Sequence, residues 1–445
     1  MHPGYLDDQF HKGAFYLQDN LVISLQKYKG FNMSNTVVLR HARVFTGITV
    51  LEDSSIIIID DKISDVLSEK RFKQRTWPKD VKVYDMEGSW VSSGFVDTHI
   101  HGLHGFDTAD GEVDSILEMS KALVEYGVTG FCPTLYPQED KDFIKAIRSI
   151  RVSIGIETGA KIFGLNLEGP FLSREKPGVL PPKNMKEVNL DLMDRYIRES
   201  GNNIVIMTVA PELKNMHELA LYCTKKGIVL SAGHSNATYE NMLEGIQAGI
   251  LHSTHFFNAM RRLHHRDPGV VGAIMIHPNV SCEIIADGYH LHPAIVKLLR
   301  EVKPINKMIL VTDSLKPTEQ KSGCLIANNE EVYYDEGVFK RKADDTIAGS
   351  ALTMIKGVKN LAGMGFDVDD ALRMASCNPV TVLSRQIQTG YILPGRYADI
   401  TSFDDDFGVK LTMVQGEVKY INMDKPKKRV KILQDDEKKK ADTKN

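Results

Sequence analysis

The chain has 445 residues, of which 42% are hydrophobic and 25% are charged. Soluble globular proteins have this composition, so it excludes a chain that is disordered throughout, a collagen-like chain and a coiled-coil fibre. No segment approaches the roughly 18 consecutive apolar residues of a membrane-spanning helix, and residues 1–30 lack the apolar segment of a secretory signal. We therefore expect a folded protein with no membrane-inserted part.

The charge is unevenly distributed along the chain. The formal net charge is −3 at pH 7, but residues 425–445 contain nine Lys and Arg and only four Asp and Glu. The remainder is therefore acidic, which argues against nucleic acid as the main partner because phosphate binding requires a positive surface. We predict that residues 424–445 form a disordered basic tail, and a targeting or anion-binding patch is the alternative.

The cysteine pattern indicates a reducing environment. The five cysteines are odd in number and widely spaced, and no C-x-x-C motif occurs. Such a pattern does not predict a disulfide framework. We therefore expect a cytoplasmic protein.

Both ends of the chain are predicted to contribute to one small β domain. Residues 1–34 are weakly patterned and are expected to be an extension, with one helix at about residues 15–28. Short segments rich in β-branched residues follow, separated by turn residues, and segments of the same kind occur again near the carboxyl end. These predicted strands are 36–45, 55–59, 81–84, 399–403, 409–413 and 417–421. Since they flank everything else, we expect residues 35–93 and 391–423 to form a discontinuous β-sandwich.

Residues 94–390 show a different rhythm, in which apolar strand-like runs alternate with helix-like segments. The eight runs are 94–101, 127–135, 161–168, 203–210, 227–234, 249–255, 280–287 and 307–313. Strands that alternate with helices predict parallel pairing, and eight units over about 250 residues predict an α/β fold of the (β/α)8 TIM-barrel type. A doubly wound open sheet is the alternative, but its first strand should lead into a glycine-rich phosphate loop. Here that strand ends in a histidine pair.

Several predicted strands end in imidazole or carboxylate side chains. These are His99 and His101 after the first strand, Glu168 after the third, His234 after the fifth, His255 after the sixth and Asp313 after the eighth. The carboxyl ends of barrel strands surround one catalytic mouth. A single histidine at a strand end is usually structural, but independent structural histidines have no reason to gather at the same end. The joint pattern predicts a divalent metal site, with zinc, iron, cobalt and manganese as candidates.

A metal at this mouth predicts hydrolytic chemistry. Coordination lowers the pKa of water to about 7 and can polarise a carbonyl group. Asp313 is then expected to accept the proton of the water and to pass it to a leaving amine, and a helix N-cap is its alternative role. No G-x-S-x-G elbow and no Walker A loop occurs in the sequence. Cys132, in the motif FCPTL, is interpreted as a buried structural thiol rather than a nucleophile.

The histidine pair predicts a second ion. His99 and His101 are two residues apart on a strand, so both project to the same side. Two imidazoles beside a cation would be crowded, and a second ion held by them, with Glu168 bridging and Asp313 nearby, would resolve this crowding. A hydrogen-bonded pair of histidines is the alternative. We therefore expect one or two divalent ions per chain.

The motifs also carry a family resemblance. D-x-H-x-H after the first strand, with later single histidines and a final Asp, resembles the amidohydrolase superfamily. Seven longer strings are similar to those of N-acetylglucosamine-6-phosphate deacetylases, and the likeness extends from about Thr36 to Ile421. The strings are LNLEGPF (165–171), APEL (210–213), GHSNATY (233–239), THFFNAM (254–260), HHRDPG (264–269), IIADGYH (284–290) and AGSALTM (348–354).

This resemblance implies roles for individual residues. Glu168, His234 and His255 would hold the main ion, Asp313 would be the acid/base, and His290 would bind the substrate near its acetamide and polarise the carbonyl. The sugar phosphate would be contacted by Asn258 and Ala259, and by Arg266 across the interface of a homodimer. Ile347, Ala348, Gly349 and Val179 would line the sugar pocket. Val179 lies in the segment 177–182, where this chain departs from the Gly-Ala-His-like turn of the family.

The activity that the resemblance implies is the deacetylation of a phosphosugar. N-acetyl-D-glucosamine 6-phosphate would give D-glucosamine 6-phosphate and acetate, as a step of amino-sugar catabolism. Another amidohydrolase activity, cyclic amidase or deaminase, is one alternative. A catalytically dead scaffold is the other, although every ligand position of this chain is filled.

Overall fold

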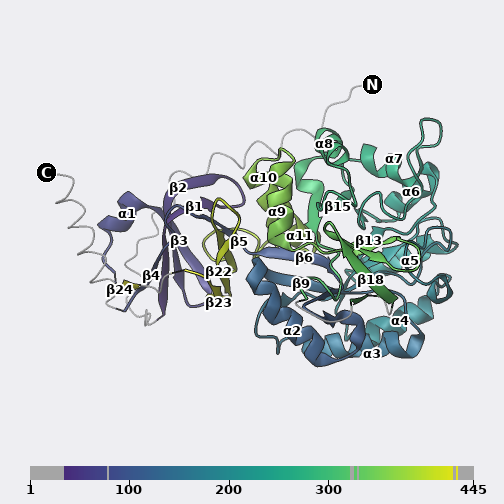
Figure 1. Ribbon diagram of the computed structural model, residues 1–445, viewed down its shortest axis with the longest axis horizontal. Helices are drawn as coiled ribbons and strands as arrows, with labels where there is room; N and C mark the ends of the chain where they lie inside the picture. Colours follow the sequence, from purple (N-terminus) through teal and green to yellow (C-terminus); the bar gives the residue numbers. More distant parts are fainter. Residues whose placement is uncertain (1–34, 78–79, 321–324, 328–329, 424–426, 429–445) are drawn as a thin grey trace, which may run out of the picture.

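The computed structural model describes residues 35–77, 80–320, 325–327, 330–423 and 427–428. They form a barrel covered by helices and a smaller β domain at one end of it (Figure 1). The predicted extension 1–34, its helix and most of the basic tail lie outside the described residues. No helix of the described part combines the length and apolarity needed to cross a membrane.

The barrel confirms the predicted rhythm of eight parallel strands. Its segments are β6 (Phe95–Ile100), β9 (Val128–Leu135), β10 (Lys161–Ile162), β11 (Leu165–Leu167), β12 (Ile204–Val209), β13 (Val229–Ala232), β14 (His252–Ser253), β15 (Ser281–Ile285) and β16 (Met308–Val311). The short segments β10 and β11 are two pieces of the third strand, and both pair with β9. Backbone hydrogen bonds from Asp313 N to His99 O (2.9 Å) and from His101 N to Ser314 O (3.0 Å) join the last strand to the first.

Helices surround the barrel because its strands are apolar on both faces. Every residue of β9 is buried, and such strands need a covering layer. The helices are α2 (Val113–Leu123), α3 (Asp140–Ser153), α4 (Leu190–Glu199), α5 (Met216–Lys225), α6 (Tyr239–Gln247), α7 (Gly269–Ile276), α8 (Pro293–Val302), α9 (Met354–Gly363), α10 (Val368–Leu372) and α11 (Asn378–Val382). In α3, for example, Phe143, Ile147 and Ile150 face the core at helical spacing. Cys132 in β9 is fully buried as expected, and burial raises the pKa of its thiol.

A four-stranded sheet that the sequence did not predict follows β16. It consists of β17 (Ile326–Ala327), β18 (Glu330–Asp335), β19 (Val338–Arg341) and β20 (Ile347–Ser350), in that order. A hairpin of β7 (Gly102–Leu103) and β8 (Phe106–Asp107) also follows the first barrel strand. The sheet brings β20 back to the mouth of the barrel, where Ser350 N donates to Asp313 O at 3.0 Å.

The second β-rich domain is built from the chain segments that precede and follow the barrel, as predicted. Figure 1 shows its purple amino-terminal strands beside the yellow carboxyl-terminal ones. Its elements are β1 (Thr36–Phe45), β2 (Val50–Ile59), β3 (Lys62–Ser68), α1 (Glu69–Gln74), β4 (Lys82–Asp85), β5 (Trp90–Ser93), β21 (Ile400–Phe403), β22 (Val409–Val414), β23 (Glu417–Ile421) and β24 (Lys427–Lys428). The strands form one branched sheet in which β1 pairs with β2, β4 and β5. Of the predicted tail, β24 pairs with β4.

A cluster of charged side chains ties α1 to β1. Arg40 and Glu69 are buried and form an ion pair, and His41 lies between Glu69 and Asp85. The hydrogen bonds from His41 to Asp85 and Glu69 raise the pKa of the imidazole to about 9. His41 is therefore a cation at neutral pH and contributes to the stability of this domain.

Candidate metal centre and active site

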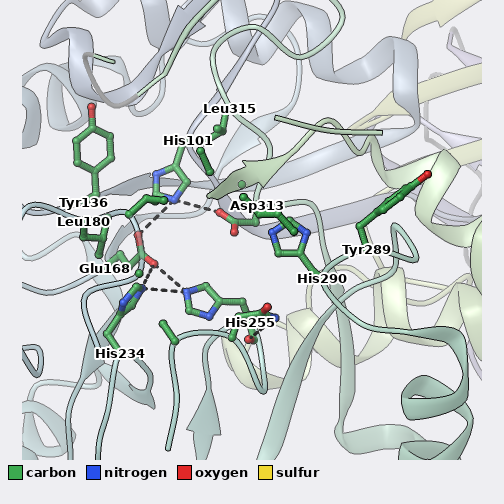
Figure 2. A pocket seen from close by; sticks show the side chains of 17 residues that line it. His101, Tyr136, Glu168, Leu180, His234, His255, Tyr289, His290, Asp313 and Leu315 are labelled. Carbon is green, nitrogen blue, oxygen red and sulfur yellow. Dashed lines mark hydrogen bonds and ion pairs between the residues drawn. The ribbon is translucent and has the colours of Figure 1, made fainter. Parts of the chain in front are cut away.

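The six predicted ligands lie at the carboxyl ends of the barrel strands. His99 lies within β6, and the other five each follow their strand closely. All six are at least nine-tenths buried: His99 (0% exposed), Glu168 (3%), His101 (4%), His234 (4%), His255 (5%) and Asp313 (8%). Figure 2 shows His101, Glu168, His234, His255 and Asp313 pointing toward one another. Donor atoms of Glu168, His234 and His255 form one compact group, and those of His99, His101 and Asp313 form another. The structure thus brings together every ligand that the sequence predicted.

In the first group two imidazoles face one carboxylate. The Nε2 atoms of His234 and His255 each lie 3.0 Å from Oε1 of Glu168, and 3.2 Å from each other. His234 Nδ1 donates to the carbonyl oxygen of Lys176 at 3.0 Å, so the lone pair of the neutral ring is on Nε2. Three electron-pair donors converge here, and this arrangement fits a divalent cation.

The second group has the same character. His99 Nε2 and His101 Nε2 are 3.3 Å apart, and Asp313 Oδ1 lies 3.5 Å and 3.3 Å from them. The Nδ1 atoms donate elsewhere, in His99 to Glu283 Oε2 at 2.9 Å and in His101 to the carbonyl oxygen of Thr134 at 3.1 Å. The carboxylate of Glu283 and the carbonyl oxygen of Thr134 can only accept hydrogen bonds, so in their neutral form both rings direct lone pairs at each other and at Asp313. This second set of donors also fits a cation.

Glu168 lies between the two groups. Its Oε1 faces His234 and His255, and its Oε2 is 3.4 Å from His101 Nε2. Burial acts to raise the pKa of Glu168, but its interactions with the surrounding imidazoles of His101, His234 and His255 hold the pKa well below its usual range. The carboxylate is therefore anionic and directs one oxygen toward each group.

The backbone at three ligand positions is left-handed. His234, His255 and Asp313 have φ of 46°, 26° and 49°. Residues with a Cβ adopt this region at a cost, and such positions concentrate where side chains must be aimed at a site. Asp313 does not start a helix, since the next helix, α9, begins at Met354. The N-cap alternative for Asp313 is therefore wrong.

An open pocket lies above the two groups. It is lined by five predicted ligands and by the predicted substrate residues Val179, Asn258, Ala259, His290, Ile347, Ala348 and Gly349. The lining also includes residues that sequence reasoning missed: Tyr136, Gly178, Leu180, Tyr289 and Leu315. Arg266 is exposed on the loop before α7 and does not line the pocket of its own chain.

His290 is held beside Asp313 by a partner that the sequence did not single out. Its Nδ1 donates to Asp287 Oδ2 at 2.6 Å, and Asp287 Oδ1 accepts the backbone N–H groups of Tyr289 and His290. Burial acts to lower the pKa of His290, but the hydrogen bond to Asp287 raises it above the ordinary value. His292, by contrast, caps α8.

Comparison with known proteins agrees with this geometry. Residues 90–419 match the amidohydrolase family. The N-acetylglucosamine-6-phosphate deacetylase of Bacillus subtilis is 31% identical over 395 residues, covering 88% of this chain and 98% of that protein. The human enzyme of the same name is 32% identical over 345 residues, covering 75% of this chain and 84% of that protein. The chain belongs to the N-acetylglucosamine-6-phosphate deacetylase family.

Solved deacetylases of this family share the fold. The crystal structure of the Pasteurella multocida enzyme superposes with a TM-score of 0.81 at 28% identity, covering 87% of this chain and all (100%) of that chain. A D267A variant of the deacetylase from Mycobacterium smegmatis, solved in complex with N-acetyl-D-glucosamine-6-phosphate, gives a TM-score of 0.80 at 26% identity, covering 87% and 100%.

The residue of this deacetylase site that sequence reasoning missed most clearly is Glu283. It lies in the middle of β15, is fully buried at 0% exposure, and contacts ligands of both groups. A signal was present, because Glu283 is the one charged residue in the otherwise uncharged strand SCEII. A carboxylate there has to be paired inside the barrel.

Proposed function

We propose that the chain is a metal-dependent amide hydrolase that deacetylates N-acetyl-D-glucosamine 6-phosphate to D-glucosamine 6-phosphate and acetate, in amino-sugar catabolism. One observation carries this function: six buried ligand side chains converge below an open pocket. The family membership supplies the substrate, since the relatives that match over most of this chain carry the name of this deacetylase.

Two divalent ions per chain fit the donor atoms. Glu168, His234 and His255 would hold one, and His99, His101 and Asp313 would hold the other, with Glu168 between them. Zinc is the ion that we propose, with iron, cobalt and manganese as alternatives that accept the same imidazole and carboxylate ligands. A divalent cation bound here supplies Lewis-acid polarisation of the amide carbonyl and lowers the pKa of water to about 7.

Asp313 is the proposed acid/base. Its carboxylate lies in the pocket between His101 and His290 (Figure 2). It accepts the proton as the water oxygen bonds to the carbonyl carbon. It then delivers that proton to the amide nitrogen as the carbon–nitrogen bond breaks, so the sugar leaves as an amine and the acyl group as acetate.

His290 orients the amide. The hydrogen bond to Asp287 fixes its Nδ1 proton and raises the pKa of the ring, which favours a protonated Nε2. Protonated Nε2 donates to the carbonyl oxygen and stabilises the negative charge that develops on it. The ring lines the pocket beside Asp313, as this role requires.

The phosphate is proposed to be bound by residues of two subunits. Asn258 and Ala259 line the pocket, whereas Arg266 lies outside it on an exposed loop. A guanidinium group pairs well with a phosphate, and a homodimer would let Arg266 of one subunit reach the pocket of the other. Val179, Ile347, Ala348 and Gly349 line the wall that would face the sugar.

The other proposed functions are less well supported. A cyclic amidase or deaminase does not agree with the family, and a dead scaffold would not need six intact ligands.

We place the enzyme in the cytoplasm, because four of its five cysteines are free and buried in the described chain.

Acetate release tests the proposal. Purified protein loaded with zinc is expected to release acetate and glucosamine 6-phosphate from N-acetyl-D-glucosamine 6-phosphate, and a chelator should abolish the release. Readdition of the metal should restore it. Turnover that is unaffected by complete metal removal, or no turnover in the metal-replete protein, would contradict the proposal.

A further inference from the structure

The carboxylate of Glu283 holds one ligand of each group. Its Oε2 accepts His99 Nδ1–H at 2.9 Å and the backbone N–H of His255 at 3.0 Å. Its Oε1 accepts His252 Nε2–H at 3.3 Å. Glu283 is therefore a fully buried anion whose three donors all come from the metal centre or directly below it.

The contact with His99 sets the direction of its lone pair. A carboxylate accepts only, so the proton of the neutral ring must be on Nδ1 and the lone pair on Nε2. That lone pair faces His101 and Asp313. Without Glu283 the other tautomer would place an N–H group where an ion must bind.

The contacts with His255 stabilise a strained turn. His255 has a φ of 26°, and its N–H is held by the side chain of Glu283 while Phe256 N donates to the Glu283 carbonyl oxygen at 2.9 Å. These two bonds keep His255 Nε2 aimed at Glu168. Glu283 thus acts on the second group through a side chain and on the first through the backbone.

Glu283 is itself fixed from below. His252 Nδ1 lies 2.8 Å from Ser281 Oγ, so the ring that donates to Oε1 is held at both nitrogens. His252 and Ser281 begin β14 and β15 and line a separate cavity at the opposite end of the barrel. The chain of contacts Ser281–His252–Glu283–His99 runs through the barrel interior to the metal centre.

We propose that Glu283 is the positioning residue of the metal centre, which fixes the tautomer of His99 and the backbone of His255 so that both groups bind their ions tightly. This role rests on the proposed metal-dependent function. The role requires a negative charge and two oxygens that both accept hydrogen bonds. A buried side chain of equal size that lacks these features cannot replace the carboxylate.

Two substitutions separate positioning from packing. In Glu283→Gln the amide oxygen can still accept from His99 and His255, while the amide NH2 faces His252, which can move its proton to Nδ1 and donate to Ser281. In Glu283→Leu no acceptor remains. Loss of a hydrogen bond to a metal ligand weakens metal binding by about 10- to 100-fold. We therefore expect the loss of ion affinity to be near the lower end of this range for Glu283→Gln and near the upper end for Glu283→Leu.

The ion affinity of the full-length chain measures this series. Cobalt is added to metal-free protein by equilibrium dialysis, bound ion is counted by elemental analysis, and the visible spectrum of bound cobalt reports the ligand geometry. Glu157→Gln and Glu157→Leu are the matched controls, because Glu157 is a buried carboxylate that accepts backbone N–H groups of Gly155 and Ile162 away from the site. The control variants should bind cobalt like the wild type. Wild-type affinity and spectrum in both Glu283 variants would overturn the proposal, as would equal losses in the Glu157 pair.

The wild-type protein gives a test that does not depend on the folding of a Glu283 variant. In protein labelled with 15N-histidine, the signal lost in His99→Gln should show a proton on Nδ1 both before and after zinc is added. A neutral ring with its proton on Nε2 would refute the role. The ion affinity and the histidine spectrum are both independent of turnover. Wild-type protein that binds ions but releases no acetate would therefore contradict the proposed function without contradicting this inference.

Discussion

Replacement of Asp313 by Asn removes the proposed acid/base with little change in shape. The side chain is 12% exposed and its Oδ1 lies 3.3 Å from His101 Nε2. Asparagine has the same size, so no cavity forms, but it can neither accept a proton at neutral pH nor carry a negative charge. The first group, Glu168, His234 and His255, keeps all of its ligands.

The expected loss is large and falls on kcat. General acid–base catalysis contributes about 10²- to 10⁴-fold, which corresponds to about 3–5 kcal/mol of barrier at 1.36 kcal/mol per tenfold change. The KM should change little, because Asp313 is not among the residues proposed to hold the phosphate. Weaker binding of the second ion is also expected, since one of its three ligands loses its charge.

Coupled detection of acetate gives kcat and KM, and elemental analysis of the same sample gives the ion content. Asp399→Asn is the matched control, because Asp399 is a buried aspartate of the small domain, 4% exposed, and should leave kcat unchanged. Asp313→Asn with more than about one tenth of the wild-type kcat would remove Asp313 from the mechanism.

Four further outcomes are expected. Unphosphorylated N-acetylglucosamine should be turned over at least about 100-fold less efficiently than the 6-phosphate, because remote binding energy positions the amide; equal kcat/KM values would contradict this. Arg266→Ala mixed with Asp313→Asn should recover activity through hybrid dimers, and no recovery despite proven subunit exchange would argue that Arg266 acts within its own chain. His99→Gln combined with His101→Asn should lower the ion content from two to one per chain and leave some activity, whereas one ion in both proteins would exclude the second site. His41→Asn should lower Tm by about 2–4 °C at pH 6. Because folding raises the pKa of His41 to about 9, the difference in Tm between wild type and variant should be complete below pH 6.5 and should vanish as the pH rises through 9. A difference in Tm that grows with pH would contradict this assignment.

Local pattern was sufficient to predict the barrel and the six side chains that converge at its mouth. The alternation of apolar runs with helix-like segments is a property of neighbouring residues, and the eight strands appear where that rhythm placed them. His99, His101 and Glu168 could be predicted as ligands because barrel topology sends all strand ends to one mouth, whatever the loops do. In these respects the sequence determined the fold and the centre of the site.

Contacts between distant segments could not be predicted in this way. Residues 347–349 reach the pocket only through a four-stranded sheet whose short, polar strands carry little periodic signal. Glu283 is 184 residues from His99 in the chain, and no spacing rule relates the two. Arg266, which the family strings placed at the phosphate, is left outside the pocket of its own chain.

The division has a physical cause. Strand and helix propensities act over a few residues, so the sequence determined which segments form the barrel and which side chains end its strands. The tautomer of an imidazole, the left-handed turn at His255 and the pairing of a buried carboxylate depend on what the closed barrel packs against them. These were decided only by the tertiary structure, because an unpaired charge inside a barrel is unstable until distant strands bring its partners.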